Sequence, residues 1–423
     1  MKKCVIVGIG QRSLQAYVIP LTKELADCVE ICGVYDLNHK RAACAAKFTG
    51  CDIPVFDDFS TMLEETRPDV VLVTTIDSCH DEYIIKALEF GCDVITEKPM
   101  TTDDVKCNAI LEAEKRTGND LKVTFNARFR PFYTRVKELM DSGIVGDVLS
   151  VHFEWMLGTK HGGDYFRRWH RQRKNSGSLL IHKSTHHFDL LNWWINDEPE
   201  AVNAFGSSRF YGPTRKERGE RCLTCAYKNT CEYYFDLPGD EFLSQLYYEC
   251  EDVDGYYRDR CIFSDEIDIE DSVAVNIKYK KGTVVCYTLT AYSPYEGCKI
   301  VFNGSKGRLE VDHIRTGINS ENPYSIRLYN ALGEEIKYNF KKEEIVTTAV
   351  QSANGLTRDN DTGHGGSDPL MRAMLFRGVS KDPLGHVANS RAGAYSIGIG
   401  IAANKSMKEH RQVSLSEFLP YTD

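Results

Sequence analysis

Lys98 follows a strand-like run, a position from which its ammonium group could contact a reacting atom. The triplet Glu97-Lys98-Pro99 follows residues 93–96, a short run of the kind that forms a β-strand. An ammonium group fixed at a strand end can hold an oxygen atom and stabilise the negative charge that develops on it. If a dinucleotide binds beside Lys98, the triplet predicts a hydride-transfer site.

A glycine turn at the start of the chain supplies the expected dinucleotide site. The strand-like run 4–7 leads into Gly8-Ile9-Gly10 and then into the apolar start of a helix. Gly8 permits a tight turn, and Gly10 lets the backbone approach a pyrophosphate, which would lie against the free N–H groups of the helix. We expect five residues to form this part of the site: Gly8, Gly10, Gln11, Arg12 and Ser13, the last in the position of a third glycine.

Asp36 is the residue expected to select between the nicotinamide dinucleotides. It follows the strand-like run 29–35, where a carboxylate commonly accepts hydrogen bonds from the adenosine ribose. Because an acid at this position repels the additional phosphate of NADP, the sequence favours NAD. Arg12, Lys40 and Arg41 are close enough in the sequence to keep NADP as the alternative. Glycine turns and strand-end acids also occur singly in domains that bind no cofactor, so the inference depends on their joint occurrence.

Strand-like and helix-like runs alternate through the first part of the chain. The alternation predicts right-handed crossovers and a doubly wound parallel sheet, an α/β Rossmann domain that binds NAD and spans residues 1–123. The expected strands are residues 4–7, 29–35, 70–74, 94–96 and 121–125, and the expected helices are residues 14–27, 39–48, 59–66 and 82–90.

Longer alternating runs characterise the rest of the chain. They predict an α+β domain over residues 124–423, built on one open, largely antiparallel sheet. The expected strands are residues 148–155, 272–279, 283–290 and 326–329, and the expected helices are residues 132–142, 186–195 and 369–377. A polar, tyrosine-rich insertion at about residues 211–265 has no periodicity that assigns its structure.

Composition excludes several partners. Of 423 residues, 42% are hydrophobic and 27% charged, the balance of a soluble globular protein long enough for two domains. A net charge of −9 without a long basic run argues against nucleic acid. No apolar segment approaches the roughly 20 residues that span a bilayer, and the short apolar start does not resemble a signal peptide. We therefore expect a cytoplasmic protein that binds neither nucleic acid nor a membrane.

A group of cysteines in the insertion has the spacing of a metal site. Cys222, Cys225 and Cys231 form a C-x2-C-x5-C pattern, and two thiolates separated by two residues can bind one tetrahedral zinc ion. We select Cys261 as the fourth ligand, with Cys250 as the alternative. A closed four-cysteine site would stabilise the insertion without performing chemistry. Free thiols, an iron–sulfur cluster and a disulfide are the other interpretations.

Several motifs together resemble the Gfo/Idh/MocA family of sugar oxidoreductases. Besides the glycine turn and the lysine triplet, residues 126–131 (NARFRP) are similar to the family's N-x-R-[YF]-x-P segment. Residues 177–189 (GSLLIHKSTHHFD) are similar to its G-x-x-L-x-D-x-G-x-H-x-x-D signature. The resemblance implies a nucleotide domain followed by an open-sheet domain that packs a carbohydrate against the nicotinamide. It also implies a homo-oligomer, a dimer or tetramer, formed through the open sheet face, which would otherwise expose apolar area.

By this resemblance Lys98 and His186 are the catalytic pair. The role suits a histidine, because oxidation of an alcohol needs a base whose pKa lies near neutrality. The family's aspartate is replaced by His182 and is followed by Lys183, so we count both as catalytic candidates. A neutral His182 could orient His186, and Lys183 could share the proton transfer or bind a substrate hydroxyl. The alternative is that these histidines only cap backbone groups at a helix start.

The resemblance and the local sequence supply the remaining contact residues. On the cofactor side they are Thr75, His80, Glu97 and Asn126, of which Thr75 and His80 could instead cap a helix. On the substrate side they are Arg128, Tyr165, Arg168, Trp169, Lys183 and His187. A solvated helix turn or an interface is the alternative for residues 165–171. Asp189 is expected to face backbone amides. The turn 363–368 is expected to precede a helix capped by Asp368 and could line the substrate pocket.

These residues favour one function over two others. The favoured function is an NAD-dependent oxidoreductase that takes a hydride from a secondary hydroxyl carbon of a sugar, glycoside or cyclitol. The first alternative is a glycosidase that keeps NAD bound and oxidises, eliminates and reduces in turn, with no net redox change. The second is a non-enzymatic sensor of NAD and sugar, against which the presence of both Lys98 and His186 argues.

Overall fold

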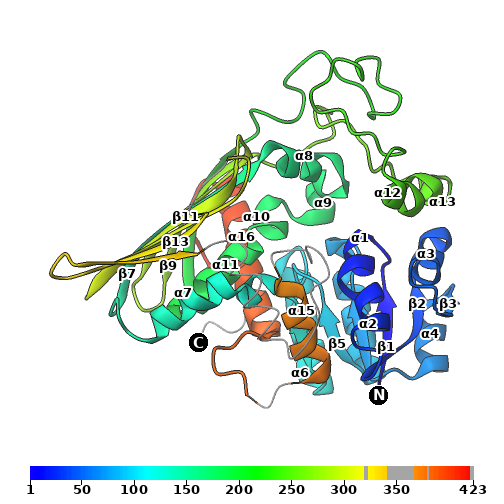
Figure 1. Cartoon of the computed structure of the whole chain (residues 1–423), viewed down its shortest axis with the longest axis horizontal. Helices are drawn as coiled ribbons and strands as arrows, with labels where there is room; N and C mark the ends of the chain where they lie inside the picture. Colours follow the sequence, from blue (N-terminus) through cyan, green and yellow to red (C-terminus); the bar gives the residue numbers. More distant parts are fainter. Residues whose placement is uncertain (319–322, 341–365, 379–380, 420–423) are drawn as a thin grey trace.

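Two sheets organise the chain in the computed structural model, which describes residues 1–318, 323–340, 366–378 and 381–419 (Figure 1). Within these residues, the first sheet has seven strands in the order β15-β6-β5-β4-β1-β2-β3. The second has nine in the order β14-β13-β12-β11-β7-β10-β9-β8-β16. The prediction of a parallel α/β domain followed by an open, largely antiparallel sheet is confirmed.

The nucleotide domain is a doubly wound parallel sheet. Its strands are β1 (Lys2–Val7), β2 (Val29–Tyr35), β3 (Val55–Phe56), β4 (Val70–Val73), β5 (Asp93–Thr96) and β6 (Leu121–Val123). The helices are α1 (Gln11–Ser13), η1 (Leu14–Val18), α2 (Ile19–Lys23), α3 (His39–Thr49), α4 (Phe59–Thr66), α5 (His80–Phe90) and α6 (Asp104–Thr117). β1 pairs in parallel with β2 on one side and β4 on the other, so the strand order reverses at the end of β1, where ligands bind in such sheets.

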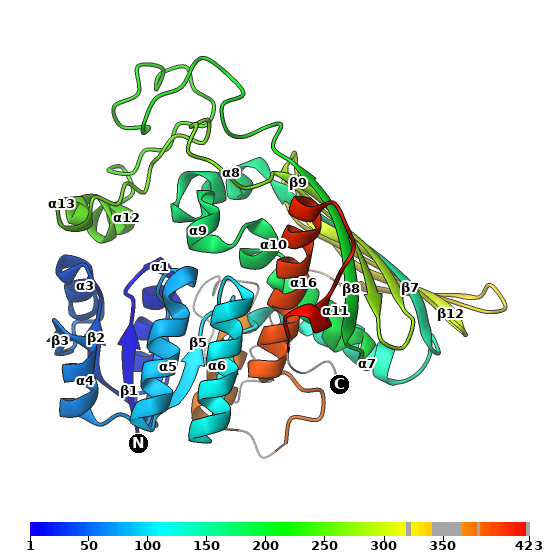
Figure 2. The same ribbon diagram turned by 180° about the vertical axis from the view of Figure 1, so that it is seen from behind.

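Both faces of this sheet are buried, which explains its continuous apolar strands. In β1, Cys4 and Ile6 belong to one hydrophobic cluster, and Val5 and Val7 belong to the other. Helices cover the two faces: α1 and α2 lie over the face seen in Figure 1, and α5 and α6 lie over the face seen in Figure 2.

The second domain places a layer of helices against one face of its sheet. The strands are β7 (Val148–Gly158), β8 (Pro199–Ser207), β9 (Ser272–Tyr279), β10 (Val284–Ser293), β11 (Glu296–Gly304), β12 (Gly307–Thr316), β13 (Tyr324–Asn330), β14 (Glu335–Phe340) and β16 (Val413–Ser414). The helices are η3 (Asn126–Phe129), α7 (Pro131–Asp141), α8 (Thr159–Arg167), η4 (Trp169–Arg171), α9 (Arg173–Ser176), α10 (Leu179–His182), α11 (Thr185–Ile195) and α16 (Ser390–Glu409). β10 pairs in parallel with β7, whereas the other neighbours are antiparallel.

Alternating burial shows which sheet face carries the core. In β9, Val273, Val275 and Ile277 are buried, and the residues between them are exposed. The helices α7, α11 and α16 lie on the buried side (Figure 2). The opposite face is the one expected to form an oligomer, which stays a prediction.

The chain returns to the first sheet near its end. Helix α15 (Ser367–Arg372) and the π-helical turn η6 (Ala373–Arg377) precede β15 (Ala388–Asn389), which pairs antiparallel with β6. The expected cap at Asp368 is wrong, because α15 is capped at Gly366 without a side-chain hydrogen bond. Of the turn 363–368, residues 363–365 lie outside the described part of the chain.

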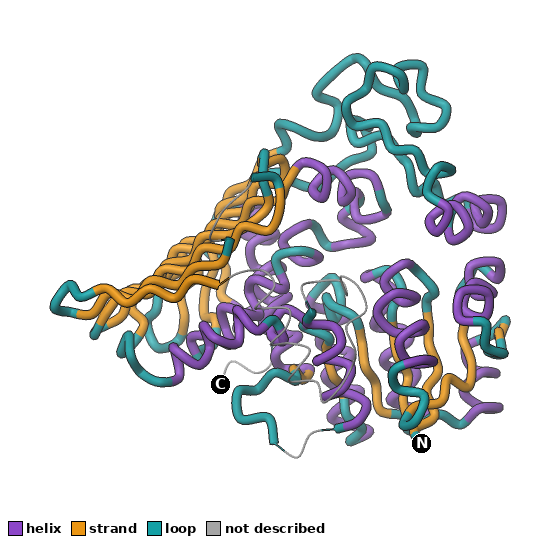
Figure 3. Tube along the Cα trace, in the orientation of Figure 1, coloured by secondary structure: helices purple, strands orange, loops and turns teal. Residues whose placement is uncertain are grey.

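The insertion leaves the second sheet between β8 and β9 and extends to the nucleotide domain. It is mostly loop, with short helices α12 (Glu241–Leu246), η5 (Tyr248–Cys250) and α13 (Glu251–Asp254) (Figure 3). Figures 1 and 2 both place α12 and α13 next to α3. Among the helices that the structure describes, none has the length and apolar character needed to cross a membrane.

A buried ion pair ties the start of the second domain to its helical layer. The guanidinium group of Arg128 donates to both carboxylate oxygens of Asp189, at 2.5 and 2.8 Å, and to the carbonyl of Gly385 at 2.7 Å. Arg128 is 6% exposed and Asp189 1% exposed, so neither is free to meet a ligand. The expectations that Arg128 binds substrate and that Asp189 faces backbone amides are both corrected.

We expect Arg128→Met to destabilise the protein by about 3–5 kcal/mol, because it leaves the buried carboxylate of Asp189 without its partner. Urea unfolding followed by tryptophan fluorescence measures this loss. Arg128→Met/Asp189→Leu should recover most of it. The control is Arg135→Met, which removes an exposed ion pair with Glu138 and should cost less than about 1 kcal/mol. Equal losses in the two single variants would contradict the assignment.

Candidate functional site

A cavity of about 630 Å³ lies where the two domains and the insertion meet. Most of the predicted residues line it: Gly8, Gly10, Gln11, Arg12, Asp36, Thr75, His80, Glu97, Lys98, Asn126, Tyr165, Arg168, Trp169, His182, Lys183, His186 and His187. Two predicted residues do not line it. Ser13 is fully buried in the first helical turn, and Arg128 is held in the ion pair with Asp189.

The glycine turn has the geometry that a bound pyrophosphate needs. Gly8 has φ +86°, and a Cβ atom there would lie 2.7 Å from the backbone nitrogen of Thr75. The turn leads directly into α1, and Gly10, Gln11 and Arg12 at this helix start line the cavity. The residues present therefore fit a dinucleotide.

Asp36 is fixed at the end of β2. Its carboxylate accepts hydrogen bonds from the backbone N–H groups of Ile9 at 2.7 Å and Asn38 at 2.8 Å. Arg41 lies 3.6 Å from this carboxylate and is also paired with Asp254 of the insertion at 2.5 Å. Burial raises the pKa of Asp36, and the charge of Arg41 opposes that rise. The carboxylate is thus positioned by backbone groups and still lines the cavity.

Glu97 is engaged by protein groups on the cofactor side. It accepts hydrogen bonds from Arg12 and from the hydroxyl of Tyr17, both at 2.7 Å. Arg12 is also paired with Asp368, which accepts a further hydrogen bond from Asn126 at 2.8 Å. Burial would raise the pKa of Glu97, but the charges of Arg12 and Lys98 lower it. This network fixes the wall behind Lys98.

His80 links two backbone segments beneath the cavity. Its Nδ1 lies 2.9 Å from the carbonyl of Pro99 and its Nε2 lies 3.2 Å from the carbonyl of Thr75. Burial lowers the pKa of this imidazole. His80 therefore holds the lysine triplet against the strand end that contains Thr75.

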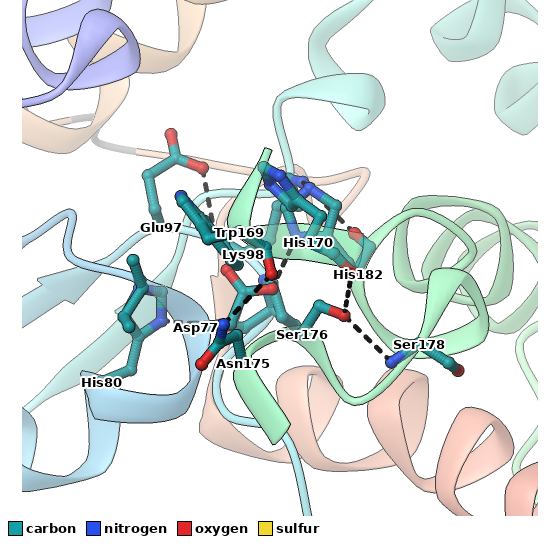
Figure 4. Close-up of polar contacts among 12 residues, drawn as sticks. Asp77, His80, Glu97, Lys98, Trp169, His170, Asn175, Ser176, Ser178 and His182 are labelled. Atoms are coloured by element: carbon teal, nitrogen blue, oxygen red, sulfur yellow. Dashed lines mark hydrogen bonds and ion pairs between the residues drawn. The ribbon is translucent and has the colours of Figure 1, made fainter. Parts of the chain in front are cut away.

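Lys98, His182 and Asp77 form a chain of contacts between the domains (Figure 4). The ammonium nitrogen of Lys98 lies 3.4 Å from Nε2 of His182 and donates to the His182 carbonyl at 3.2 Å. Nδ1 of His182 lies 2.5 Å from Oδ2 of Asp77, which begins the 3-10 turn η2 (Asp77–Cys79). Sequence reasoning expected His182 to orient His186, but its two nitrogens face Lys98 and Asp77.

These contacts determine where the protons lie. An ammonium group can only donate, so Nε2 of His182 accepts and Nδ1 carries the proton donated to Asp77. Burial lowers the pKa of Lys98 and of His182 and raises the pKa of Asp77. Moving a proton from Lys98 through His182 to Asp77 would remove both charges without changing the number of protons. The arrangement can therefore hold Lys98 as a cation or release its proton.

A second polar chain lies on the sheet side of the cavity. The hydroxyl of Tyr165 lies 3.1 Å from Nε2 of His161, whose Nδ1 lies 2.9 Å from Glu296. Arg315 is paired with the same carboxylate at 2.5 Å. Burial would raise the pKa of Glu296, but the hydrogen bond from His161 and the charges of Arg315 and Lys183 lower it to about 2. Glu296 is therefore ionised.

Aromatic rings surround the remaining predicted substrate residues. Trp169 stacks on His170, with ring centroids 3.6 Å apart. His187 stacks on Trp155 at 4.0 Å, and its Nδ1 lies 2.7 Å from the hydroxyl of Tyr287. The ammonium group of Lys183 lies 5.2 Å from the centroid of the Trp155 ring. These faces suit a ligand with both apolar and hydroxyl surfaces.

The insertion closes the cavity over the glycine turn. The hydroxyl of Tyr247 accepts a hydrogen bond from the backbone N–H of Gln11 at 3.0 Å. Asp254 and Tyr256 also line the cavity. The predicted insertion therefore contributes to the cofactor side of the site, which its sequence did not indicate.

The expected zinc site is not supported. In the part of the chain that the structure describes, no three His, Cys, Asp or Glu side chains are grouped so that they could hold a metal ion. Instead, the thiol of Cys222 accepts from Arg167 at 2.9 Å, and that of Cys231 accepts from Arg215 at 3.0 Å. Cys225 and Cys261 are partly buried free thiols. Arginine contacts stabilise this part of the insertion where metal ligation was expected.

Several cavity residues were missed in the sequence. Asp77 lies just after β4, at the carboxyl edge of a parallel sheet, and that position was a usable signal. Arg130 and Arg315 come from a loop and a strand whose orientation toward the cavity depends on packing. Tyr247 and Asp254 lie in a segment without periodicity, so the sequence carried no signal for them.

Comparison with known proteins identifies relatives of both domains. Residues 2–125 match the model described as "Oxidoreductase family, NAD-binding Rossmann fold", and residues 137–415 match that of the C-terminal alpha/beta domain of the same Gfo/Idh/MocA family. YteT of Bacillus subtilis, named as an oxidoreductase, is 37% identical and covers 99% of this chain and 98% of its own. An inositol 2-dehydrogenase/D-chiro-inositol 3-dehydrogenase of Lactiplantibacillus plantarum is 26% identical over 47% of this chain and 54% of its own.

Solved structures share the fold. A levoglucosan dehydrogenase, solved with NADH and levoglucosan, superposes with a TM-score of 0.67 at 18% identity and covers 98% of this chain and 99% of its own. At this identity the match concerns the arrangement of both domains only.

We expect Asp77→Asn to lower the pH at which Lys98 loses its proton by about one pH unit, because the charge of Asp77 raises the pKa of Lys98. Labelling by acetic anhydride at a series of pH values, with mass spectrometry of the Lys98 peptide, measures the midpoint. Glu82→Gln, which removes an exposed acid from α5, is the control. A midpoint that stays in place or rises in Asp77→Asn would refute the coupling.

Proposed function

Because the chain belongs to the Gfo/Idh/MocA family of oxidoreductases, we propose that it is an NAD-dependent dehydrogenase of a sugar, glycoside or cyclitol. It would remove a hydride from a secondary hydroxyl carbon. The observation that supports this most is the convergence of Lys98, from the nucleotide domain, and His182 and His186, from the second domain, on one cavity that also contains the glycine turn.

The side chains have distinct roles in this proposal. The glycine turn, Gln11 and Asp36 hold the dinucleotide, which supplies the hydride acceptor when bound. Lys98 holds the substrate oxygen and stabilises negative charge on it, and His186 accepts the hydroxyl proton. Asp77 and His182 position the ammonium group of Lys98 and set its charge. In the family signature an aspartate stands at the position of His182. Here the carboxylate comes instead from Asp77, in the nucleotide domain, and reaches the site through His182.

The surroundings of Asp36 support NAD over NADP. A 2′-phosphate would lie next to the carboxylate of Asp36, which is already fixed by two backbone N–H groups. Arg41, the nearest cation, is shared between Asp36 and Asp254, so its charge is compensated. A phosphate would have to displace both carboxylates to reach it.

The carbohydrate class rests on the walls of the cavity and on the relatives. Trp155, Tyr165 and Trp169 present aromatic surface, and the His161 and Lys98 chains present donors at several positions. One relative is named an inositol dehydrogenase, and one solved structure of the same fold is a levoglucosan dehydrogenase bound to levoglucosan. A compact polyol or sugar ring fits both observations.

A redox-cycling glycosidase is the second candidate, and one observation favours it. The insertion packs on the glycine turn through Tyr247 and on α3 through Asp254, so it would cover a bound dinucleotide and slow its release. Retention suits a reaction in which NAD is reduced and reoxidised within one turnover. Release of an aglycone from a glycoside without accumulation of NADH would select this candidate.

We expect a panel of monosaccharides, O- and C-glycosides and inositols to reveal a substrate that reduces NAD⁺, detected by absorbance of NADH. With that substrate, Lys98→Met should lower kcat about 10²-fold or more, since it removes the group that stabilises charge on the reacting oxygen. The affinity for NAD⁺, measured by fluorescence titration, should change by less than about threefold. Lys86→Met, on the outer surface of α5, is the control. Equal turnover in Lys98→Met would contradict the assigned role.

A further inference from the structure

Three cations gather on the sheet side of the cavity. Lys183 follows α10, Arg130 precedes α7, and Arg315 lies on β12, so three separate segments direct positive charge to one wall. Burial lowers the pKa of Lys183 and of Arg130, and the cations add to this: Arg315 and Arg130 lower the pKa of Lys183, and Arg315 lowers that of Arg130. The sequence gives no reason for this wall to be cationic in a site for neutral sugars.

The carboxylates nearby compensate these charges only in part: Glu296 raises the pKa of Lys183 and Asp368 that of Arg130, but each carboxylate is paired with another arginine. Glu296 is paired with Arg315, while Asp368 accepts from Arg12 and Asn126. Glu296 is ion-paired with Arg315, whereas Lys183 and Arg130 form no ion pair within the described residues. The neighbouring imidazoles add no positive charge, because burial lowers the pKa of both His161 and His187.

Two of the three cations have no hydrogen-bond partner in the part of the chain that the structure describes. Lys183 is 7% exposed, and its ammonium group lies 5.2 Å from the centroid of the Trp155 ring. The guanidinium of Arg130 lies 5.6 Å from the Tyr133 ring, and its Nε is buried without an acceptor. Burying the ammonium group of Lys183 and the Nε of Arg130 in this state is costly unless a ligand compensates them. Burial together with the neighbouring cations lowers the pKa of Lys183 to about 7, which a bound anion would reverse.

We propose that the substrate is an anionic sugar whose carboxylate or phosphate group binds to Lys183 and Arg130. This deepens the proposed function and rests on it for the reaction, although not for the binding. The anion would accept hydrogen bonds from the ammonium and guanidinium groups. Such hydrogen bonds are stronger when the acceptor is charged. The ring would then extend from this wall toward Lys98 and His186.

The test compares three sugars that differ at one carbon: a hexuronate, the corresponding hexose 6-phosphate and the neutral hexose, in the gluco, galacto and manno series. Isothermal titration into the NAD⁺-loaded protein should show the uronate or the phosphate binding at least about tenfold tighter than the hexose. The tighter of the two identifies the anion. Lys183→Met should weaken the anionic sugar about 10²-fold and leave the hexose unchanged, while Lys183→Arg should restore binding.

The control is Lys299→Met, which removes an exposed cation from β11 on the other face of the sheet. Preference for the hexose, or unchanged anion binding in Lys183→Met, would overturn the proposal while leaving the dehydrogenase assignment intact. Lysine-dependent binding of an anionic sugar without NADH formation would instead refute the proposed function and support the ligand class.

A second inference concerns the insertion and stands on different contacts. Tyr247 is 5% exposed, and its hydroxyl would lie 3.5 Å from a Cβ placed on Gly10. The ring is held by Arg41, whose guanidinium carbon lies 5.7 Å from its centroid. The insertion around it is anchored by the Lys40–Asp252 ion pair at 2.6 Å and by a buried hydrogen bond from Asn38 to the Cys250 carbonyl at 2.8 Å. The position of this hydroxyl is therefore fixed.

We infer that Tyr247 is a ligand of the dinucleotide pyrophosphate. Its oxygen accepts from the N–H of Gln11, which leaves the hydroxyl proton available, and no acceptor for that proton lies within the described residues. A phosphate oxygen at the start of α1 would accept it. The hydroxyl thus adds a donor to those of the backbone, from a segment more than 200 residues away in the chain.

We expect Tyr247→Phe to weaken ADP-ribose and NAD⁺ about tenfold and to leave adenosine unchanged, because only the first two carry the pyrophosphate. Tyr248→Phe, which alters an exposed neighbour, is the control. Fluorescence titration of the full chain gives the three dissociation constants. Equal or tighter binding of ADP-ribose in Tyr247→Phe would show that the hydroxyl only occupies the phosphate position. Equal losses for adenosine and ADP-ribose would show a purely structural role.

Discussion

The contact between His182 and Asp77 is the interaction on which the site depends. It joins the carboxyl edge of the parallel sheet to the helical layer of the second domain, with 2.5 Å between nitrogen and oxygen. Because His182 also faces Lys98, the contact places the lysine and couples its protonation to the tautomer of the imidazole. A change in the relative position of the domains would alter the charge of Lys98, the group that we propose acts on the substrate. Domain packing and the protonation of Lys98 are therefore coupled in this protein.

Elsewhere in the cavity, charged side chains are likewise paired with charged groups from other segments of the chain. Arg12 is held by Glu97 and Asp368, Arg41 by Asp36 and Asp254, and Glu296 by His161 and Arg315. Each set combines residues distant in the sequence. Within the described residues Lys183 and Arg130 have no ion pair of this kind, and it is there that we propose an anionic ligand.

The spacing of apolar residues in the sequence predicts much of this fold but only part of the site. The strand at 272–279 and the helix near 186–195 were predicted at almost their observed bounds, since their apolar residues repeat with the period of the element. The first helix begins at Gln11 and ends at Lys23, several residues before the predicted 14–27, because the glycine turn starts it. Arg128 was assigned to substrate from its motif. The sequence could not show that Arg128 is buried in an ion pair, because its partner, Asp189, lies 61 residues further along the chain.

The return of the chain to the first sheet has a consequence for how the protein can be divided. β15 covers the edge of β6, and α16, which follows it directly, packs between that edge and the second sheet, with Gly393 against Val123 and Gly400 against the Leu180 carbonyl. A fragment that stops after the first 123 residues would expose the backbone edge of β6 and the apolar surface beneath α16. The nucleotide-binding half is thus completed by the last fifth of the polypeptide. The two domains therefore depend on one another for burial, because β15 and α16 cover surfaces of both.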